Sequence, residues 1–214
     1  MIMVMTDNEE ALIIFSIIAV VVLGAAIASW VSTRRKTIRH LQNLATQLQL
    51  EFLPSPSWFK EPRVAGTRRG RTVQIFNYRT GSGKTTRTWS AVSAQPAGDG
   101  RLTFTIRQRN LTTRINHIFG PKPITLGDPE FDKAWFVQTN QPEFLLNGLL
   151  PEVRARLMEA RHAGAKGTFE LDYAMVKYSE SGCFTSSKCV GRFRAAAEAV
   201  CDLAELAEVA VKNT

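Results

Sequence analysis

Histidine and cysteine are scarce in this sequence, with three of each among 214 residues. His40, His117 and His162 are far apart in the chain, and the closest two cysteines, Cys183 and Cys189, have five residues between them. Paired zinc ligands are usually separated by about two to four residues. The sequence therefore offers neither a metal site nor a histidine-based triad. The odd number of cysteines agrees with a reducing compartment, where they stay free thiols.

Acidic residues are rarely grouped either. The densest set is Asp128, Glu130 and Asp132 in the stretch LGDPEFDKAW. Asp-Pro-Glu commonly begins a turn or a helix, with the aspartate as the N-cap, so this pattern favours capping over catalysis. Nor does the sequence point to a nucleophile beside a base, or to two carboxylates in contrasting surroundings. We therefore predict that the protein is not an enzyme and has no cofactor.

Charge and proline are both absent from residues 11–31, ALIIFSIIAVVVLGAAIASWV. A helix of this length, at about 1.5 Å per residue, spans the roughly 30 Å of a bilayer's hydrocarbon. The sequence therefore predicts a single transmembrane helix after a short N-terminus of residues 1–10. A cleaved signal peptide is the alternative, because Ala26-Ile27-Ala28 resembles a cleavage site. The acidic start and the long apolar run favour a retained anchor.

Lysine and arginine are missing before this helix but follow it at once, as Arg34, Arg35, Lys36 and Arg39. An excess of positive charge marks the cytoplasmic side of a spanning helix. We therefore expect the N-terminus outside and residues 32–214 in the cytoplasm.

Acids are also few in the chain that follows the anchor. Residues 34–122 contain 17 Lys and Arg against three acids, whereas residues 123–214 contain 10 bases against 13 acids. Basic groups near the cytoplasmic leaflet attract anionic lipid headgroups. The candidate contacts for such headgroups, or for a phosphate, are Arg34, Arg35, Lys36, Arg68, Arg69, Arg71, Arg79, Lys84 and Arg87. Solvated charge without a ligand is the alternative, and no recognisable nucleic-acid-binding motif is present.

The stretch TGSGKTT, residues 80–86, resembles a nucleotide-binding loop but lacks two of its parts. The first glycine of that motif falls on Tyr78, and the β-branched residues after Lys84 disfavour the required helix. Two glycines and a serine between β-forming runs instead predict a hairpin turn with a basic tip. This tip could contact a phosphate group or be a solvated loop. Nucleotide binding through residues 81–86 stays as a third hypothesis.

The remaining periodicities predict an α+β domain. Apolar residues at steps of three and four predict a stalk helix, and prolines at 54 and 56 end it, so that residues 32–56 form a stalk and linker and residues 57–214 the domain. Short β-forming runs predict an antiparallel meander sheet packed by C-terminal helices. The predicted strands are 64–66, 72–78, 86–94, 101–107, 134–138 and 168–177, and the predicted helices are 141–150, 151–162 and 186–211.

Aromatic residues are concentrated in the middle of the chain, at Phe119, Phe131, Trp135, Phe136 and Phe144. Core packing is the expected role of such large side chains. A groove for an apolar ligand is the alternative.

Three segments give the sequence a broader likeness: LQNLATQLQLEF, VQIFNYRTGSGKTTRTWSAVSAQ and ITLGDPEFDKAWFVQTNQPEFLLNGLLPEVRARLME. With the preceding anchor, they resemble a widespread group of uncharacterised bacterial membrane-anchored proteins. The resemblance covers most of residues 35–180 and implies anchoring in the inner membrane, a hairpin at the glycine-rich stretch and no established activity. Together these features predict a cytoplasmic binding module with a protein partner. Sensing of anionic lipid is the alternative function.

Overall fold

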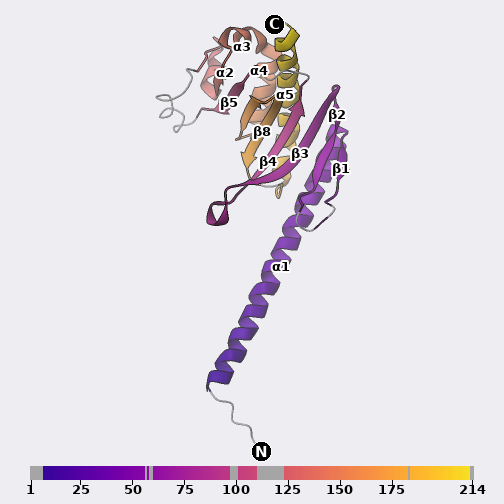
Figure 1. The fold of residues 1–214 in the computed structure, drawn as a ribbon, viewed down its shortest axis with the longest axis vertical. Helices are drawn as coiled ribbons and strands as arrows, with labels where there is room; N and C mark the ends of the chain where they lie inside the picture. The colour runs from indigo at the N-terminus through magenta and orange to yellow at the C-terminus, as the bar shows by residue number, and fades with distance from the viewer. Residues whose placement is uncertain are drawn as a thin grey trace, which may run out of the picture.

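The structure is a computed structural model that describes residues 7–55, 57, 60–96, 101–109, 123–182 and 184–212. It confirms the predicted α+β fold, with a long N-terminal helix and a sheet packed by C-terminal helices (Figure 1). The helices are α1 (Asp7–Leu48), α2 (Pro129–Ala134), α3 (Pro142–Gly148), α4 (Pro151–His162) and α5 (Ser187–Lys212). The strands are β1 (Glu51–Leu53), β2 (Arg63–Arg68), β3 (Arg71–Thr80), β4 (Arg87–Gln95), β5 (Phe104–Gln108), β6 (Trp135–Thr139), β7 (Thr168–Asp172) and β8 (Met175–Ser181).

The predicted spanning segment and the predicted stalk form one uninterrupted helix, α1. Within the described residues this is the one helix long and apolar enough to cross a membrane. Its last turns belong to the domain, because Leu41, Leu44 and Leu48 are fully or almost fully buried against the strands and α5. The helix ends at Leu48, and the left-handed φ of 56° at the next residue, Gln49, lets the Leu50 N–H donate to the Ala45 carbonyl at 2.8 Å.

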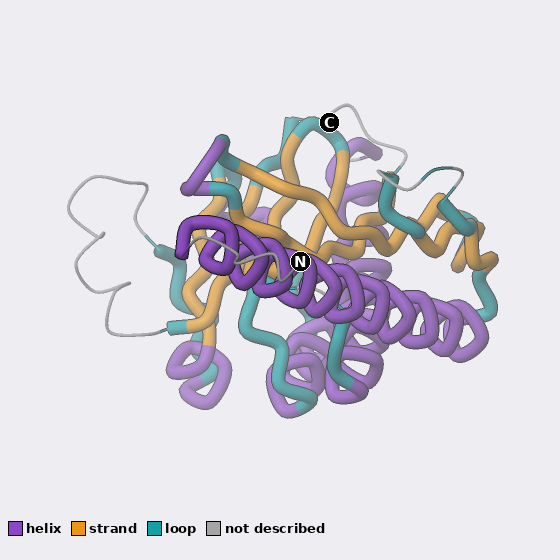
Figure 2. Tube along the Cα trace, turned by 90° about the horizontal axis from the view of Figure 1, so that it is seen from below, coloured by secondary structure: helices purple, strands orange, loops and turns teal. Residues whose placement is uncertain are grey.

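All eight strands form one antiparallel sheet in the order β1-β2-β3-β4-β8-β7-β5-β6. Strand β1, which was not predicted, pairs with β2 at one edge, and the predicted strand 101–107, here β5, does not pair with β4. Strands β2, β3 and β4 follow the predicted meander. The second half of the sheet does not, because β8 returns to pair with β4, and β5 lies between β7 and β6. Figure 2 shows the strands as one twisted layer with α1 lying along one side of it.

The two faces of the sheet differ in what covers them. One face carries buried apolar residues, including Ile75, Val92 and Tyr178, and packs on α5 and the end of α1. The alternate positions, such as Phe76 and Trp89, are half-buried. An antiparallel sheet can keep one face in water, and this alternation is its expected signature.

Helix α5 supplies the centre of the core. The predicted apolar face is buried at Phe193, Ala196, Ala197, Val200, Leu203, Ala204 and Ala207. Aromatic rings continue from this helix through the sheet: Phe184, Phe193, Tyr178, Phe169 and Trp135 follow one another with centroids 4.6, 5.5, 4.7 and 5.8 Å apart. Core packing is thus confirmed for Phe131, Trp135 and Phe136 of the aromatic concentration, while Phe119 lies outside the described residues.

A buried polar network ties β8 to α5 and to the start of β7. The Tyr178 hydroxyl donates to Glu180 at 2.5 Å and accepts from the Gly167 N–H at 3.1 Å, and Arg192 pairs with Glu180 at 2.6 Å. Burial, together with the adjacent Glu180, raises the pKa of Tyr178, so its hydroxyl stays protonated as a donor. The Tyr178 hydroxyl and the Glu180 carboxylate therefore both have partners, whereas the buried Nε of Arg192 has none among the described residues.

One strand prediction is wrong: residues 168–177 form two strands rather than one. Tyr173 and Ala174 make a two-residue turn between β7 and β8, with φ values of 47° and 58°. Two consecutive positive φ values define the type I′ turn, for which Asn-Gly is the usual sequence signal. The dipeptide Tyr173-Ala174 is not such a signal. The alternation of apolar and polar residues over 168–177 therefore gives no sign of the turn, although Tyr173 lies in it and is 90% exposed.

We predict that changing Tyr173→Asn together with Ala174→Gly raises the free energy of unfolding by about 1 kcal/mol, because both residues then tolerate a positive φ. Urea unfolding of a fragment of residues 34–214, which keeps the packed end of α1, measures the change. Ala163→Gly is the matched control, since Ala163 has a φ of −69° and gains nothing from glycine. Equal effects of the two changes contradict the prediction.

Candidate functional site

The nine basic residues named as candidate contacts fall into two groups in the structure. Arg68, Arg69 and Arg71 lie at the β2–β3 turn, where they face a row of carboxylates on α5. This row consists of Glu198, Asp202, Glu205 and Glu208. These positions are three or four residues apart and therefore share one side of the helix.

Arg71 makes the most complete of these ion pairs. Its guanidinium holds both carboxylate oxygens of Glu208, at 2.8 and 2.6 Å, and reaches Glu205 at 3.2 Å, while its side chain is only 11% exposed. Such a two-pronged contact is stronger and more specific than a single one. Arg69 pairs with Asp202 and Glu198.

Arg68 connects this cluster to the anchor helix. It pairs with Glu198, and it also donates to the Leu48 carbonyl at the end of α1 at 2.7 Å. One side chain thus links α1, β2 and α5. The charge of the three arginines is balanced within the protein. Sequence reasoning missed these partners because the acids lie about 130 residues further along the chain.

The second group of basic residues surrounds the β3–β4 hairpin tip: Arg79, Lys84 and Arg87. Lys84 lies in the short 3₁₀ turn η1 (Gly83–Thr85), and all three side chains are exposed. Arg79 is 3.6 Å from Glu61, a loose pair for an exposed side chain. Neither Lys84 nor Arg87 makes an ion pair with any residue that the structure describes.

The hairpin confirms that TGSGKTT is a turn. The ladder between β3 and β4 runs as far as Thr80 and Arg87, and Gly81 and Gly83 adopt positive φ values of 85° and 55°. At Gly81 a Cβ would lie 2.6 Å from the Thr85 carbonyl oxygen, so this position requires glycine. A strand follows η1, whereas phosphate binding of the nucleotide-loop type needs a helix N-terminus there.

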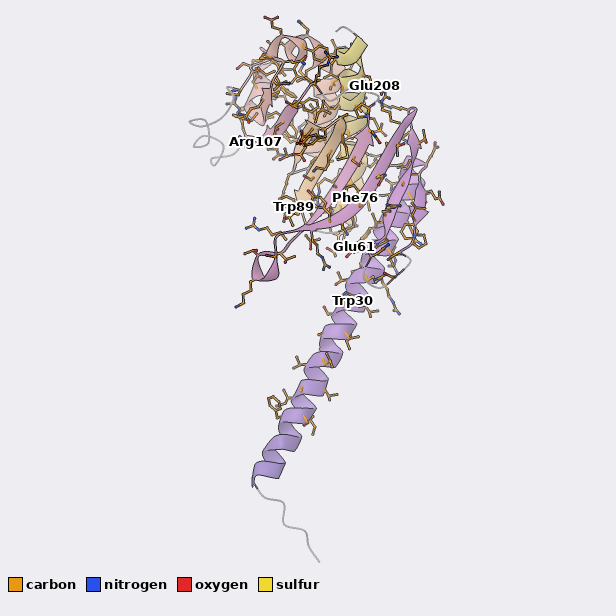
Figure 3. All side chains as sticks on the ribbon, in the orientation of Figure 1. Trp30, Glu61, Phe76, Trp89, Arg107 and Glu208 are labelled. Atoms are coloured by element: carbon orange, nitrogen blue, oxygen red, sulfur yellow. The ribbon has the colours of Figure 1, made fainter. Side chains whose placement is uncertain are left out.

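The basic tip points to the same end of the molecule as the apolar part of α1. In Figures 1 and 3 the hairpin projects from the sheet toward the N-terminal half of α1 and reaches about the level of Trp30 along the long axis. On α1, Arg34 stacks over the Trp30 ring at 5.5 Å, and Arg35 and Lys36 are exposed. Six of the nine basic candidates therefore lie on the side of the α+β domain that faces the apolar part of α1.

The acidic set around Asp128 has the expected structural role. Asp128 caps α2 by accepting from the Phe131 N–H at 3.1 Å, and it pairs with Arg154 at 3.2 Å. Asp132 accepts from the Leu126 N–H at 3.0 Å, whereas Glu130 is exposed. These contacts confirm the capping prediction.

The described thiols are buried. Burial, helped by Glu198, raises the pKa of Cys201 to about 11, so the nucleophilic thiolate is a minor form at neutral pH. Cys189 is also buried, while Cys183 and His117 lie outside the described residues. Within the part of the chain that the structure describes, no three His, Cys, Asp or Glu side chains come together as metal ligands.

Fold and site define an α+β domain joined to a candidate membrane-spanning helix, with a basic hairpin directed along that helix. No model of a known protein family matches the sequence, and no curated protein matches it. Among solved structures, the chain is similar to the mycobacterial trehalose monomycolate transport factor A, TtfA. The TM-score is 0.50 with 12% identity, over 82% of this chain and 96% of that one. At this identity the likeness shows a shared fold.

We predict that Arg71→Ala lowers the free energy of unfolding by about 2 kcal/mol, because it leaves the partly buried Glu208 without its two-pronged partner. Urea unfolding of the 34–214 fragment measures the loss. Lys84→Ala removes one exposed charge of the same sign and is expected to change stability by less than about 0.5 kcal/mol. Similar stabilities for the two variants would show that the cluster does not hold the turn on α5.

Proposed function

We propose that the protein is a membrane-anchored interaction module. Its α+β domain lies in the cytoplasm at the bacterial inner membrane and acts by binding a protein partner rather than by catalysis. The observation that carries this proposal is the continuity of α1. The same helix that is apolar enough to span a bilayer ends inside the domain core, at Leu41, Leu44 and Leu48. The membrane and the domain are thus joined by a rigid element instead of a flexible linker.

The shared fold supports a role beside a transport process. TtfA is described as a mycobacterial trehalose monomycolate transport factor. By analogy, the present chain would assist a membrane-embedded partner. Fold analogy supplies the class of role, but the partner itself has to be found by experiment.

Crosslinking in intact cells followed by affinity capture tests this function. The full chain is compared with a variant in which residues 11–31 are replaced by an unrelated spanning helix of equal length, so that the height of the domain is kept. We expect the same discrete partner with both, because binding resides in the domain. Repeated capture of nothing specific by either chain would contradict the proposal. A partner that is captured by the full chain and lost with the exchanged helix would show that the spanning helix, and not the domain, binds it.

A second function is favoured by the distribution of charge. Arg79, Lys84 and Arg87 surround the hairpin tip, which lies at about the level of Trp30 along the long axis, and Arg34, Arg35 and Lys36 follow Trp30 on α1. Basic groups close to an anionic leaflet are each attracted by about 1 kcal/mol. We propose that these six residues contact lipid headgroups and thereby set the tilt of the domain on the membrane. Arg68, Arg69 and Arg71 are directed to α5 instead.

We predict that the 34–214 fragment binds anionic vesicles more tightly than neutral ones, and that binding weakens as salt screens the charges. Replacing Arg79, Lys84 and Arg87 by Gln is expected to lower anionic-vesicle affinity by about tenfold or more, because three attractions are lost. Co-sedimentation of the fragment with the vesicles measures this affinity. Substituting the same number of exposed bases outside this hairpin, at Arg101, Lys133 and Arg161, is the matched control. Equal binding to both vesicle types would contradict the proposed contact with anionic lipid headgroups.

A further inference from the structure

A cavity of about 750 Å³ lies between α3, α4 and the C-terminal part of α5, and it is open to solvent on one side. Its walls are mostly apolar, with Phe144, Leu150, Val153, Leu206 and Val209 as the apolar lining. Its size falls within the range of functional pockets, about 300–1,000 Å³. The predicted alternative role of the aromatic concentration, a groove for an apolar ligand, thus has a counterpart beside Phe144.

The groove exists because α3 packs directly on α5. Gly148 lies so close to Leu206 that a Cβ on it would be 2.3 Å from the leucine side chain. The chain then turns at Leu149 and Leu150 into α4, which packs along α5. Leu150 is left 54% exposed and Val209 47% exposed, on opposite walls of the opening. Adjacent exposed apolar side chains rimmed by polar ones mark an interaction surface.

The polar rim of the groove is acidic. Three carboxylates, Glu152, Asp202 and Glu205, line it against one guanidinium, that of Arg156. Arg156 already pairs with Glu159 at 2.9 Å and approaches Asp202 at 3.7 Å. Asp202 is also held by Arg69, and Glu205 lies 3.2 Å from Arg71. Glu152 makes no ion pair with any described residue, so it is the rim carboxylate that is left for an occupant. An occupant that brings positive charge to the rim would therefore be favoured.

We propose that this groove binds an amphipathic helix of a protein partner, with apolar residues on one face and Lys or Arg beside them. The inference rests on the proposed function as an interaction module and assigns its partner site. A helix laid in an open groove buries its apolar face and leaves its polar face in water. A cation that flanks this face meets Glu152 at the rim. Bilayer lipid is disfavoured as the occupant, because α3 and the end of α5 lie at the opposite end of the molecule from the apolar part of α1 (Figure 1).

The test uses the full chain in neutral-lipid nanodiscs, with empty nanodiscs as the blank. The probe is a fluorescent peptide of about 18 residues, long enough for several helical turns, with Leu at steps of three and four and Lys on the flanks. Its counterpart carries Glu in place of Lys. Anisotropy measures both affinities. We expect the basic peptide to bind, and the acidic peptide to bind at least about tenfold more weakly.

Val209→Glu and Leu150→Glu are expected to weaken binding of the basic peptide by about tenfold or more, since each places a charge in the apolar groove. Both sites are about half exposed, so the fold is retained, and the melting temperature checks this. Tyr173→Glu, which alters a 90% exposed residue at the β7–β8 turn, is the matched control and should bind like the native chain. Glu152→Lys should lower affinity for the basic peptide and raise it for the acidic one.

Three results overturn the proposal: unchanged peptide binding by both groove variants, displacement of the peptide by a long-chain fatty acid, or a native dimer that Val209→Glu dissociates. The last two would assign the groove to a small amphiphile or to a second copy of this chain. The proposed function fails separately. A crosslinked partner that is retained by the groove variants supports an interaction module that uses another surface.

Discussion

The burial of the apolar face of α5 is the constraint on which the rest of this structure depends. Small residues such as Ala196 and Val200 let the helix lie close against the sheet, and Phe193 continues the aromatic core into it. Helix α5 covers one face of the sheet, and on the opposite face some positions, such as Phe76 and Trp89, are half-buried while others, such as Ala91, are buried. The end of α1 and the whole of α4 also pack on α5. The same helix therefore fixes the anchor, supports one wall of the groove and presents its acidic side to the β2–β3 turn.

The sequence predicted what depends on local pattern and missed what depends on distant partners. The TGSGKTT turn was predictable, since its glycines lie between two β-forming runs, and so was the cap at Asp128. The β7–β8 turn was not, because Tyr173 and Ala174 adopt positive φ values that only tertiary context enforces. The return of β8 beside β4 and the pairing of Arg71 with Glu208 join segments far apart in the chain. No periodicity encodes such contacts, and the groove near Phe144 was predicted only as an unlocated alternative.

The excess basic residues in the first half of the chain fall into two groups, those paired with carboxylates and those exposed to solvent. Part of it is met by α5, where Arg68, Arg69 and Arg71 contact the acids that give the second half its negative balance. This pairing joins the two halves of the sequence. The other part, at the β3–β4 tip and on α1, is largely exposed on the side of the domain that faces the apolar part of α1. A net charge counted over the sequence conceals this division, since a base held by a carboxylate and a base in water contribute equally to the sum.

The unbroken course of α1 also has a rotational consequence. A helix with no proline kink and no loop between its apolar part and Leu48 cannot act as a swivel, because twisting it would break successive backbone hydrogen bonds. Each residue of an α-helix advances by about 100° around the axis. In the proposed membrane-anchored arrangement, the direction that the sheet faces around the membrane normal is therefore set by which side of the apolar segment contacts a neighbour. Inserting or deleting one residue there would rotate the whole domain about the axis of α1 while moving it along that axis by only about 1.5 Å.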